Sequence, residues 1–157
     1  MRIGIGYDVH PFEEGRALIL GGVRFEGERG LAGHSDGDAP THALIDALLG
    51  AAALGDIGTH FPSSDQRWRG ADSIELLKQI ARIVVAAGYE IVNVDMTVIA
   101  ERPRVAPRVR EMRAKLALAL GIDLARVSVK AKTTDGLGAI GRAEGIAAQA
   151  IALLEER

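Results

Sequence analysis

The first residues that could do chemistry are an aspartate and a histidine separated by one position, Asp8 and His10. They end an alternating run, residues 2–10, whose apolar side chains should take the opposite face of a strand. Side chains two apart on a strand lie about 7 Å apart along its axis, so they share one ion only by leaning together at the strand end. His42 could approach from a helix as a third ligand and leave a fourth position vacant. That is the pattern of a catalytic zinc site.

The same residues also allow simpler interpretations. An Asp-x-His pair on a strand is by itself more often a surface pair or a hydrogen-bonded pair than a metal site. Asp36 and Asp38 are expected to act as turn and helix-capping residues rather than as ligands. His60 is most simply a loop histidine. If His42 does bind an ion, Asp46 lies one helical turn further along and could accept a hydrogen bond that orients the imidazole.

A second stretch, residues 130–145, could approach an anion. A strand ends there in hydroxyls, a carboxylate and glycines, which allows close contact between backbone and phosphate, although a plain Gly-rich turn fits equally well. The stretch lacks the order of a Walker loop, and the pair Gly4 and Gly6 lacks the third glycine of a dinucleotide fingerprint. The residues alone therefore indicate metal-assisted chemistry, with a phosphorylated substrate as one option.

Composition limits the class of protein and the kind of site. The 157 residues suit one domain, 1–157, which can bury a substantial core. Because cysteine is absent, a metal must be held by His, Asp or Glu. The net charge of -2 and the 4% aromatic content argue against a nucleic-acid partner. No run approaches the roughly 18 apolar residues of a membrane span, and the start lacks the apolar region of a signal peptide, so we expect a cytoplasmic protein without a membrane partner.

The elements that must position these side chains follow from the apolar pattern and the turn residues. Residues 17–25 should form a second strand, bulged at its central glycines, that pairs back on the first. The pattern predicts an α/β (α+β) domain with one mixed sheet covered by helices. Strand 89–99 carries apolar residues on both faces, so another subunit could cover one of them. Helices are predicted over 39–54, 72–87, 107–120 and 144–155, and further strands over 89–99 and 127–134.

Six stretches in uninterrupted order give a more specific pattern than any single motif. They are residues 6–12 (GYDVHPF), 31–38, 42–58, 61–62, 70–73 and 130–145. Together they resemble the 2-C-methyl-D-erythritol 2,4-cyclodiphosphate synthase family. The resemblance implies a phosphorus–oxygen lyase of the non-mevalonate isoprenoid pathway. Such an enzyme converts 4-diphosphocytidyl-2-C-methyl-D-erythritol 2-phosphate into the cyclic diphosphate and releases CMP. The resemblance also implies a homotrimer, with helices on one face of each sheet, the other face toward a threefold axis, and active sites between neighbouring subunits.

The resemblance assigns two metal sites by position. Asp8, His10 and His42 would hold Zn²⁺, one per subunit, and a phosphate oxygen of the substrate would take the open position. Asp135 would hold a second ion, Mg²⁺ or Mn²⁺, that bridges the diphosphate. Family members often carry Glu where Asp135 stands and an aromatic residue where Ala139 stands. The second metal site and any cavity at the axis can therefore differ in this chain.

The resemblance also assigns residues that would contact the substrate. His34 and Thr133 match positions that stabilise the transition state. Residues 100–106 match the loop that cradles cytosine, largely with backbone atoms, and Arg142 lies near the axis, where some members are thought to bind a phosphorylated effector. The positions matched to substrate binding are Ser35, Asp56, Ile57, Gly58, Phe61, Pro62, Ser63, Ser64, Asp65, Ala100, Glu101, Arg102, Pro103, Arg104, Val105, Ala106, Lys132, Thr134 and Arg142.

The implied reaction needs no protein nucleophile. The 2-phosphate oxygen attacks the β-phosphorus of the same molecule, and these two anions repel unless cations neutralise the developing charge. Holding the substrate bent can lower the barrier by about 7–11 kcal/mol. Two rivals stay open. In a zinc phosphohydrolase the same ligands would activate water and give a linear diphosphate, and in a trimeric binding module the metal would only brace the fold.

Overall fold

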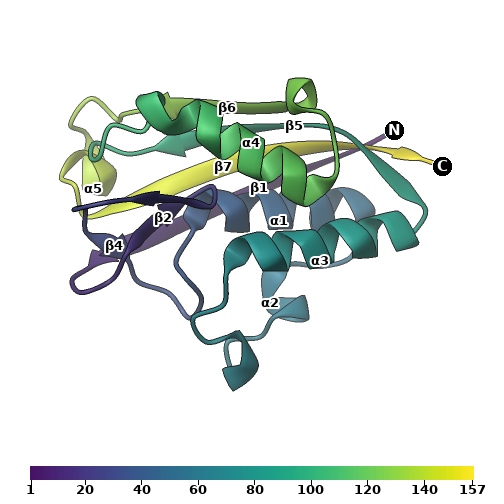
Figure 1. The fold of residues 1–157 in the computed structure, drawn as a ribbon, viewed down its shortest axis with the longest axis horizontal. Helices are drawn as coiled ribbons and strands as arrows, with labels where there is room; N and C mark the ends of the chain where they lie inside the picture. Colours follow the sequence, from purple (N-terminus) through teal and green to yellow (C-terminus); the bar gives the residue numbers. More distant parts are fainter.

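The Asp-x-His pair lies on the first strand of a five-stranded sheet whose order is β4-β1-β7-β5-β6. The computed structural model describes residues 1–157. All neighbours in this sheet are antiparallel except β5 and β6, which run parallel, so the mixed sheet predicted from the sequence is confirmed. The two chain ends lie at the same end of the molecule, as Figure 1 shows. The strands are β1 (Arg2–Glu13), β4 (Gly30–Leu31), β5 (Tyr89–Ile99), β6 (Val127–Lys132) and β7 (Gly145–Glu156).

Helices cover one face of the sheet (Figure 1). Each of the two longest begins at an aspartate: Asp38 accepts a hydrogen bond from Thr41 N, and Asp72 accepts one from Ile74 N. No helix has both the length and the apolar composition needed to cross a membrane. The helices are α1 (Ala39–Ala52), α2 (Ile57–His60), α3 (Ser73–Ala86), α4 (Val109–Leu120) and α5 (Gly138–Gly141), with 3-10 turns at Gln66–Trp68, Ala106–Arg108 and Leu124–Arg126.

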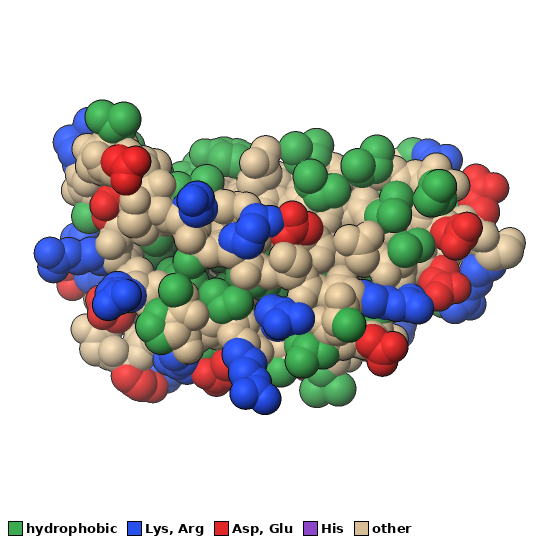
Figure 2. All heavy atoms as spheres, turned by 90° about the horizontal axis from the view of Figure 1, so that it is seen from above, with side chains coloured by type: hydrophobic (Ala, Val, Ile, Leu, Met, Phe, Trp, Pro, Cys, Tyr) green, Lys and Arg blue, Asp and Glu red, His purple; other side chains and the backbone are tan.

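The other face of the sheet is uncovered and carries an apolar strip along β1. On β1 the outward side chains of Ile3, Ile5, Tyr7 and Val9 are exposed, from 47% at Val9 to 70% at Ile3. Ile151 on neighbouring β7 extends this strip. Figure 2 shows one side of the molecule on which hydrophobic side chains alternate with charged ones and no histidine reaches the surface. A contiguous apolar strip of this kind marks an interaction surface.

Two glycines on the covered side of β1 let the first helix lie directly on the strand. A Cβ atom on Gly6 would come 1.9 Å from the carbonyl oxygen of Ala43, and one on Gly4 would come 2.1 Å from that of Ala47. Both carbonyls belong to α1, so no side chain larger than hydrogen fits between the strand and the helix. The alternation predicted for this strand is confirmed, and it places Asp8 and His10 on the side that faces α1.

The helix predicted over residues 144–155 is wrong, because this segment is strand β7. Its alanine- and leucine-rich sequence has high helix propensity. The segment nevertheless pairs with β1 along one edge and β5 along the other, and this tertiary pairing overrides the local preference. Alternate side chains on β7 are fully buried beneath the helices: Ile146, Ala148, Ala150, Ala152 and Leu154.

The second predicted strand also needs correction. Residues 17–25 form a separate two-stranded hairpin, β2 (Leu18–Leu20) and β3 (Val23–Phe25), that does not pair with β1. The turn between them, Gly21 and Gly22, donates both backbone N–H groups to the carboxylate of Asp38, each at 2.8 Å. Asp38, the N-cap of α1, thus holds the hairpin on the side of the sheet that the helices cover.

The remaining predicted elements occur near their expected positions. Strand β5 has the bounds predicted for the strand over 89–99. The other three predicted helices occur as α1, α3 and α4, and each end lies within two residues of its predicted position. Within β5 the strict alternation of faces is interrupted near its start. A bulge between Ile91 and Asn93 turns Ile91 into the core beside Val94 and leaves Val92 half-buried.

Candidate active site

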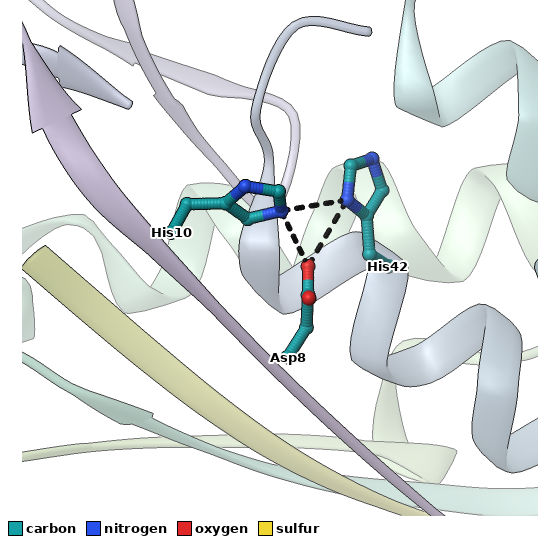
Figure 3. Close-up of side chains that lie close together, drawn as sticks. All are labelled: Asp8, His10 and His42. Carbon is teal, nitrogen blue, oxygen red and sulfur yellow. Dashed lines mark hydrogen bonds and ion pairs between the residues drawn. The ribbon is translucent and has the colours of Figure 1, made fainter. Parts of the chain in front are cut away.

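Two imidazoles and one carboxylate converge at the end of β1. Asp8 and His10 come from the strand, and His42 comes from the first turn of α1 (Figure 3). Asp8 Oδ2 lies 2.7 Å from His10 Nε2 and 3.1 Å from His42 Nδ1, and the two nitrogens are 3.3 Å apart. The structure therefore brings the three predicted ligands together through the close approach that Gly4 and Gly6 allow.

The donor set fits a zinc ion. With Zn–N and Zn–O bonds of about 2.0–2.1 Å, neighbouring ligand atoms on a tetrahedron lie about 3.3 Å apart. The separations observed here, 2.7 to 3.3 Å, approach that value, so small side-chain shifts would open the triangle around one ion. All three ligand atoms belong to groups that zinc prefers. A metal held by three protein ligands retains a position for another molecule.

A relay of two hydroxyl groups and a carboxylate holds the far side of the His42 ring. His42 Nε2 lies 2.7 Å from Ser73 Oγ and 3.0 Å from Ser35 Oγ. Ser73 in turn donates its hydroxyl proton to Asp36 Oδ1 at 2.5 Å, so its oxygen accepts the Nε2–H of His42. In the neutral imidazole this arrangement places the proton on Nε2, which leaves Nδ1 free to bind an ion.

Asp46 does not orient His42, contrary to the sequence prediction. Its Oδ1 atom instead accepts the backbone N–H of Ile57 at 2.8 Å. Asp46 thereby ties the start of α2 to α1, the helix that carries the histidine. No pattern in the sequence indicates that Ser73 and Asp36 support His42, because Ser73 lies far from His42 in the chain and is recognisable only as a residue at the start of a helix.

The electrostatics keep the carboxylate ionised. Burial alone would raise the pKa of Asp8, but hydrogen bonds from His10 and His42 and the charges of both rings lower it to about 2. Burial lowers the pKa of His42, yet the hydrogen bond to Asp8 and the charges of Asp38, Asp8 and Asp36 raise it overall. Before metal binds, the site is thus an ionised carboxylate that attracts positive charge.

The three ligands open onto a cavity of about 230 Å³. Apolar side chains, among them Trp68 and Leu76, form part of its wall. His34 sits at the rim with its Nε2 atom 3.1 Å from the carbonyl oxygen of Asp65, and Asp56 caps α2 by accepting Thr59 N at 2.8 Å. Six of the residues predicted to touch substrate line the cavity: His34, Ser35, Ile57, Gly58, Phe61 and Ser63.

Residues 100–106 and 132–135 form a second group at the ends of β5 and β6, whereas Asp56, Pro62, Ser64 and Asp65 adjoin the cavity-lining residues 57–63 in the chain. Residues 100–106 follow β5 and residues 133–138 follow β6, and these strands are parallel neighbours. Thr133 Oγ1 accepts the N–H of Asp135 at 3.2 Å. Arg142 forms an ion pair with Glu144 at 3.2 Å. None of these residues lines the cavity beside His42. Within a single chain, the predicted site residues therefore form two separate groups.

A family model matches almost the entire chain. The YgbB family model covers residues 1–155. The chain belongs to the YgbB family. It is 57% identical over 157 residues to the 2-C-methyl-D-erythritol 2,4-cyclodiphosphate synthase of Moorella thermoacetica, covering 100% of this chain and 96% of that protein. The family and the enzyme class predicted from the sequence are confirmed.

Relatives of this family also occur fused to another unit and with a nucleotide bound. The chain is 57% identical over 152 residues to "Bifunctional enzyme IspD/IspF" of Anaeromyxobacter sp. (strain Fw109-5), covering 97% of this chain but 39% of that protein. The structure titled "IspF (Plasmodium falciparum) CDP complex" superimposes with a TM-score of 0.86 at 35% identity, covering 99% of this chain and 96% of that one. The fold observed here is therefore that of enzymes in this family.

Proposed function

We propose that the chain converts 4-diphosphocytidyl-2-C-methyl-D-erythritol 2-phosphate into 2-C-methyl-D-erythritol 2,4-cyclodiphosphate and releases CMP. It would serve non-mevalonate isoprenoid biosynthesis in the cytoplasm. The observation that carries the proposal is the convergence of Asp8, His10 and His42 at an open cavity, in a chain 57% identical over 157 residues to such a synthase. The CDP bound to the Plasmodium falciparum relative supports a cytidine nucleotide as the substrate class.

The three ligands would hold one Zn²⁺ ion, which as a Lewis acid would neutralise charge on a phosphate of the substrate. The protein contributes the geometry. Asp8 is ionised at neutral pH because its pKa is lowered to about 2 by the two histidines against the effect of burial. The Ser73–Asp36 relay keeps the Nδ1 atom of His42 aimed at the ion. His34, at the rim, would donate a hydrogen bond to charge that develops in the transition state.

The second half of the site would act on the diphosphate and the base. Thr133 and Asp135 lie within 3.4 Å of each other, and Asp135 would hold a Mg²⁺ or Mn²⁺ ion against the diphosphate. Lys132 adds positive charge at the end of β6. Residues 100–106 would receive the cytosine. Because these groups lie apart from the zinc ligands in one chain, the two halves would meet between neighbouring subunits.

A homotrimer would join them. The exposed apolar strip of Ile3, Ile5, Tyr7, Val9 and Ile151 supports burial of this sheet face around a threefold axis. In such an assembly the base-binding and diphosphate-binding loops of one subunit would face the zinc ligands of the next. Arg142 would lie near the axis, where the resemblance places an effector.

The reaction would be an intramolecular displacement. An oxygen of the 2-phosphate forms a bond to the β-phosphorus while the bond from that phosphorus to the bridging oxygen breaks, and CMP leaves with that oxygen. No proton donor or water enters the balance. Holding the two phosphates together would lower the barrier by about 7–11 kcal/mol, so a nucleophile on the protein is unnecessary. The apolar wall formed by Phe61, Trp68 and Leu76 favours this path over hydrolysis because it limits water near phosphorus.

The deciding experiment is incubation of the purified chain with the cytidyl substrate and Mg²⁺, followed by phosphorus NMR. The cyclic diphosphate and an equal amount of CMP are expected. A linear diphosphate would assign the chain to the phosphohydrolases instead. His42→Ala should abolish turnover and leave a folded trimer, whereas an unfolded variant would indicate a metal that only braces the structure. Asp8→Asn should lower the zinc content, since an amide lacks the anionic charge of a carboxylate.

A further inference from the structure

The carboxylate of Glu101 reaches across to the loop that follows β6. Its Oε1 atom accepts the backbone N–H of Thr134 at 2.8 Å and that of Gly136 at 3.3 Å. The Thr134 hydroxyl also lies 3.2 Å from this oxygen, but at 2.7 Å from the carbonyl of Leu137 it donates there. These backbone hydrogen bonds lower the pKa of Glu101. The side chain is therefore an ionised acceptor whose charge is already directed at backbone donors.

The contact begins where the sheet stops. The last backbone hydrogen bond between the segment of β5 and that of β6 runs from Ala100 N to Lys132 O, at 2.9 Å. Beyond it the two backbones separate into the loops 100–106 and 133–138, and no further backbone hydrogen bond joins them. Glu101, the next residue, continues the connection with its side chain. It is the only side-chain hydrogen-bond link between the two loops.

The loop that Glu101 holds has an unfavourable backbone. Asp135 has a φ of 54°, in the left-handed region that costs a non-glycine residue free energy, and Gly136 follows at 77°. A strained turn persists only where surrounding contacts determine its shape. The N–H groups that Glu101 accepts flank Asp135 on both sides. The hydrogen bonds to Glu101 therefore determine how the Asp135 side chain is oriented. They also affect Thr133, which directly precedes Thr134.

We infer that Glu101 is a positioning residue that fixes the 133–138 loop against the 100–106 loop and so places Thr133 and Asp135. The inference rests on the proposed function, in which the first loop meets the diphosphate and the second meets the cytosine. It assigns the Glu101 side chain a role other than substrate contact. The carboxylate of Glu101 then couples the position of the loop that binds the cytosine to the positions of Thr133 and Asp135 near the phosphorus.

Three variants of the full chain test this role. Glu101→Ala removes the acceptor, Glu101→Gln keeps an amide oxygen in its place, and Glu28→Ala removes an exposed carboxylate in the segment between β3 and β4, which belongs to neither loop. Amide hydrogen exchange at Thr134 and Gly136, followed by NMR, should accelerate about 10-fold in Glu101→Ala and change little in the other two. Zinc content should be unchanged in all three, because the zinc ligands lie in the other half of the site.

Turnover provides the second measurement. Misplacement of a catalytic group by about 1 Å can cost about 100-fold in rate, so Glu101→Ala should lower kcat by that order, and Glu101→Gln should largely restore it. Unaltered exchange in Glu101→Ala would overturn the inference. Loss of kcat in Glu101→Gln with exchange still protected would also overturn it, because the charge itself would then act on the substrate. If the wild-type chain makes no cyclic product, the proposed function fails, and the exchange rates still decide the role of Glu101.

Discussion

A single methyl group placed between β1 and α1 should disable the metal site. Gly6→Ala puts a Cβ atom 1.9 Å from the carbonyl oxygen of Ala43, and contacts under 3.0 Å essentially do not occur. The strand and the helix must therefore separate by at least about 1.1 Å at this point. The obstacle is backbone, so no rotation of a side chain relieves it. Ala43 directly follows His42, so the displacement acts on the proposed third zinc ligand.

The size of this displacement decides the outcome. Ligand distances in a metal site are held within about 0.2 Å, so a shift several times larger would remove His42 from the ion that we propose for this site. We expect zinc affinity to fall by at least about 100-fold, the upper end of the range for changes outside the ligands themselves. Overpacking should also lower the free energy of unfolding of the metal-free chain by about 1–3 kcal/mol.

Zinc affinity would be measured by competition with a chelator, and stability by urea denaturation of the metal-free chain. Gly50→Ala is the matched control, because it lies on the same helix and its Cβ would meet only the carbonyl oxygen of Ile5 at 3.9 Å. That control should bind zinc normally and gain up to about 1 kcal/mol from helix propensity. Unchanged zinc affinity and an unchanged urea midpoint in Gly6→Ala would refute the claim that close packing of β1 on α1 sets the ligand geometry.

Three further outcomes follow from contacts around the site. Ser73→Ala removes the nearer of the two hydroxyl groups at His42 Nε2, so zinc affinity measured by chelator competition should fall about 10- to 100-fold in a folded chain. Asp46→Leu removes the acceptor of the Ile57 N–H and should raise KM without changing zinc content, while Asp46→Asn should stay close to wild type in steady-state kinetics. Zinc affinity should weaken as pH falls from 8, with the loss beginning above the ordinary His42 pKa of 6.5. The pKa of His42 is raised by Asp8 and nearby carboxylates against the effect of burial, and the protonated Nδ1 cannot bind an ion. A chelator titration that stays flat down to pH 6.5 would contradict this assignment.

The convergence of Asp8, His10 and His42 could be predicted from the sequence because most of their pattern is local. Asp8 and His10 share one strand face by alternation alone. His42 lies in the first turn of a helix whose N-cap, Asp38, is recognisable in the sequence. The glycines that bring these elements together were missed. From the sequence, Gly4 and Gly6 could be compared only with a dinucleotide-binding fingerprint. Their real role depends on the helix that packs against them, and no local pattern indicates which helix that is.

The errors share a physical cause, which is contact between distant segments. Residues 145–156 support two periodicities, because alanine and leucine tolerate both a helix and a central strand. Only the presence of β1 and β5 on either side selects the strand. The contact of Glu101 with the loop after β6 and that of Asp46 with α2 also join segments separated in the chain, so residue type alone could not assign their partners.

The antiparallel pairing of the first and last strands has a consequence for how such a chain can be joined to others. Arg2 lies opposite Leu154, so both ends emerge from one short side of the sheet. Asp8 lies six residues further along β1, a distance of about 20 Å. A second enzyme attached at either end would sit on the side remote from Asp8, His10 and His42 and leave the mouth of the cavity open. This geometry is compatible with a bifunctional relative of which this chain spans 39%.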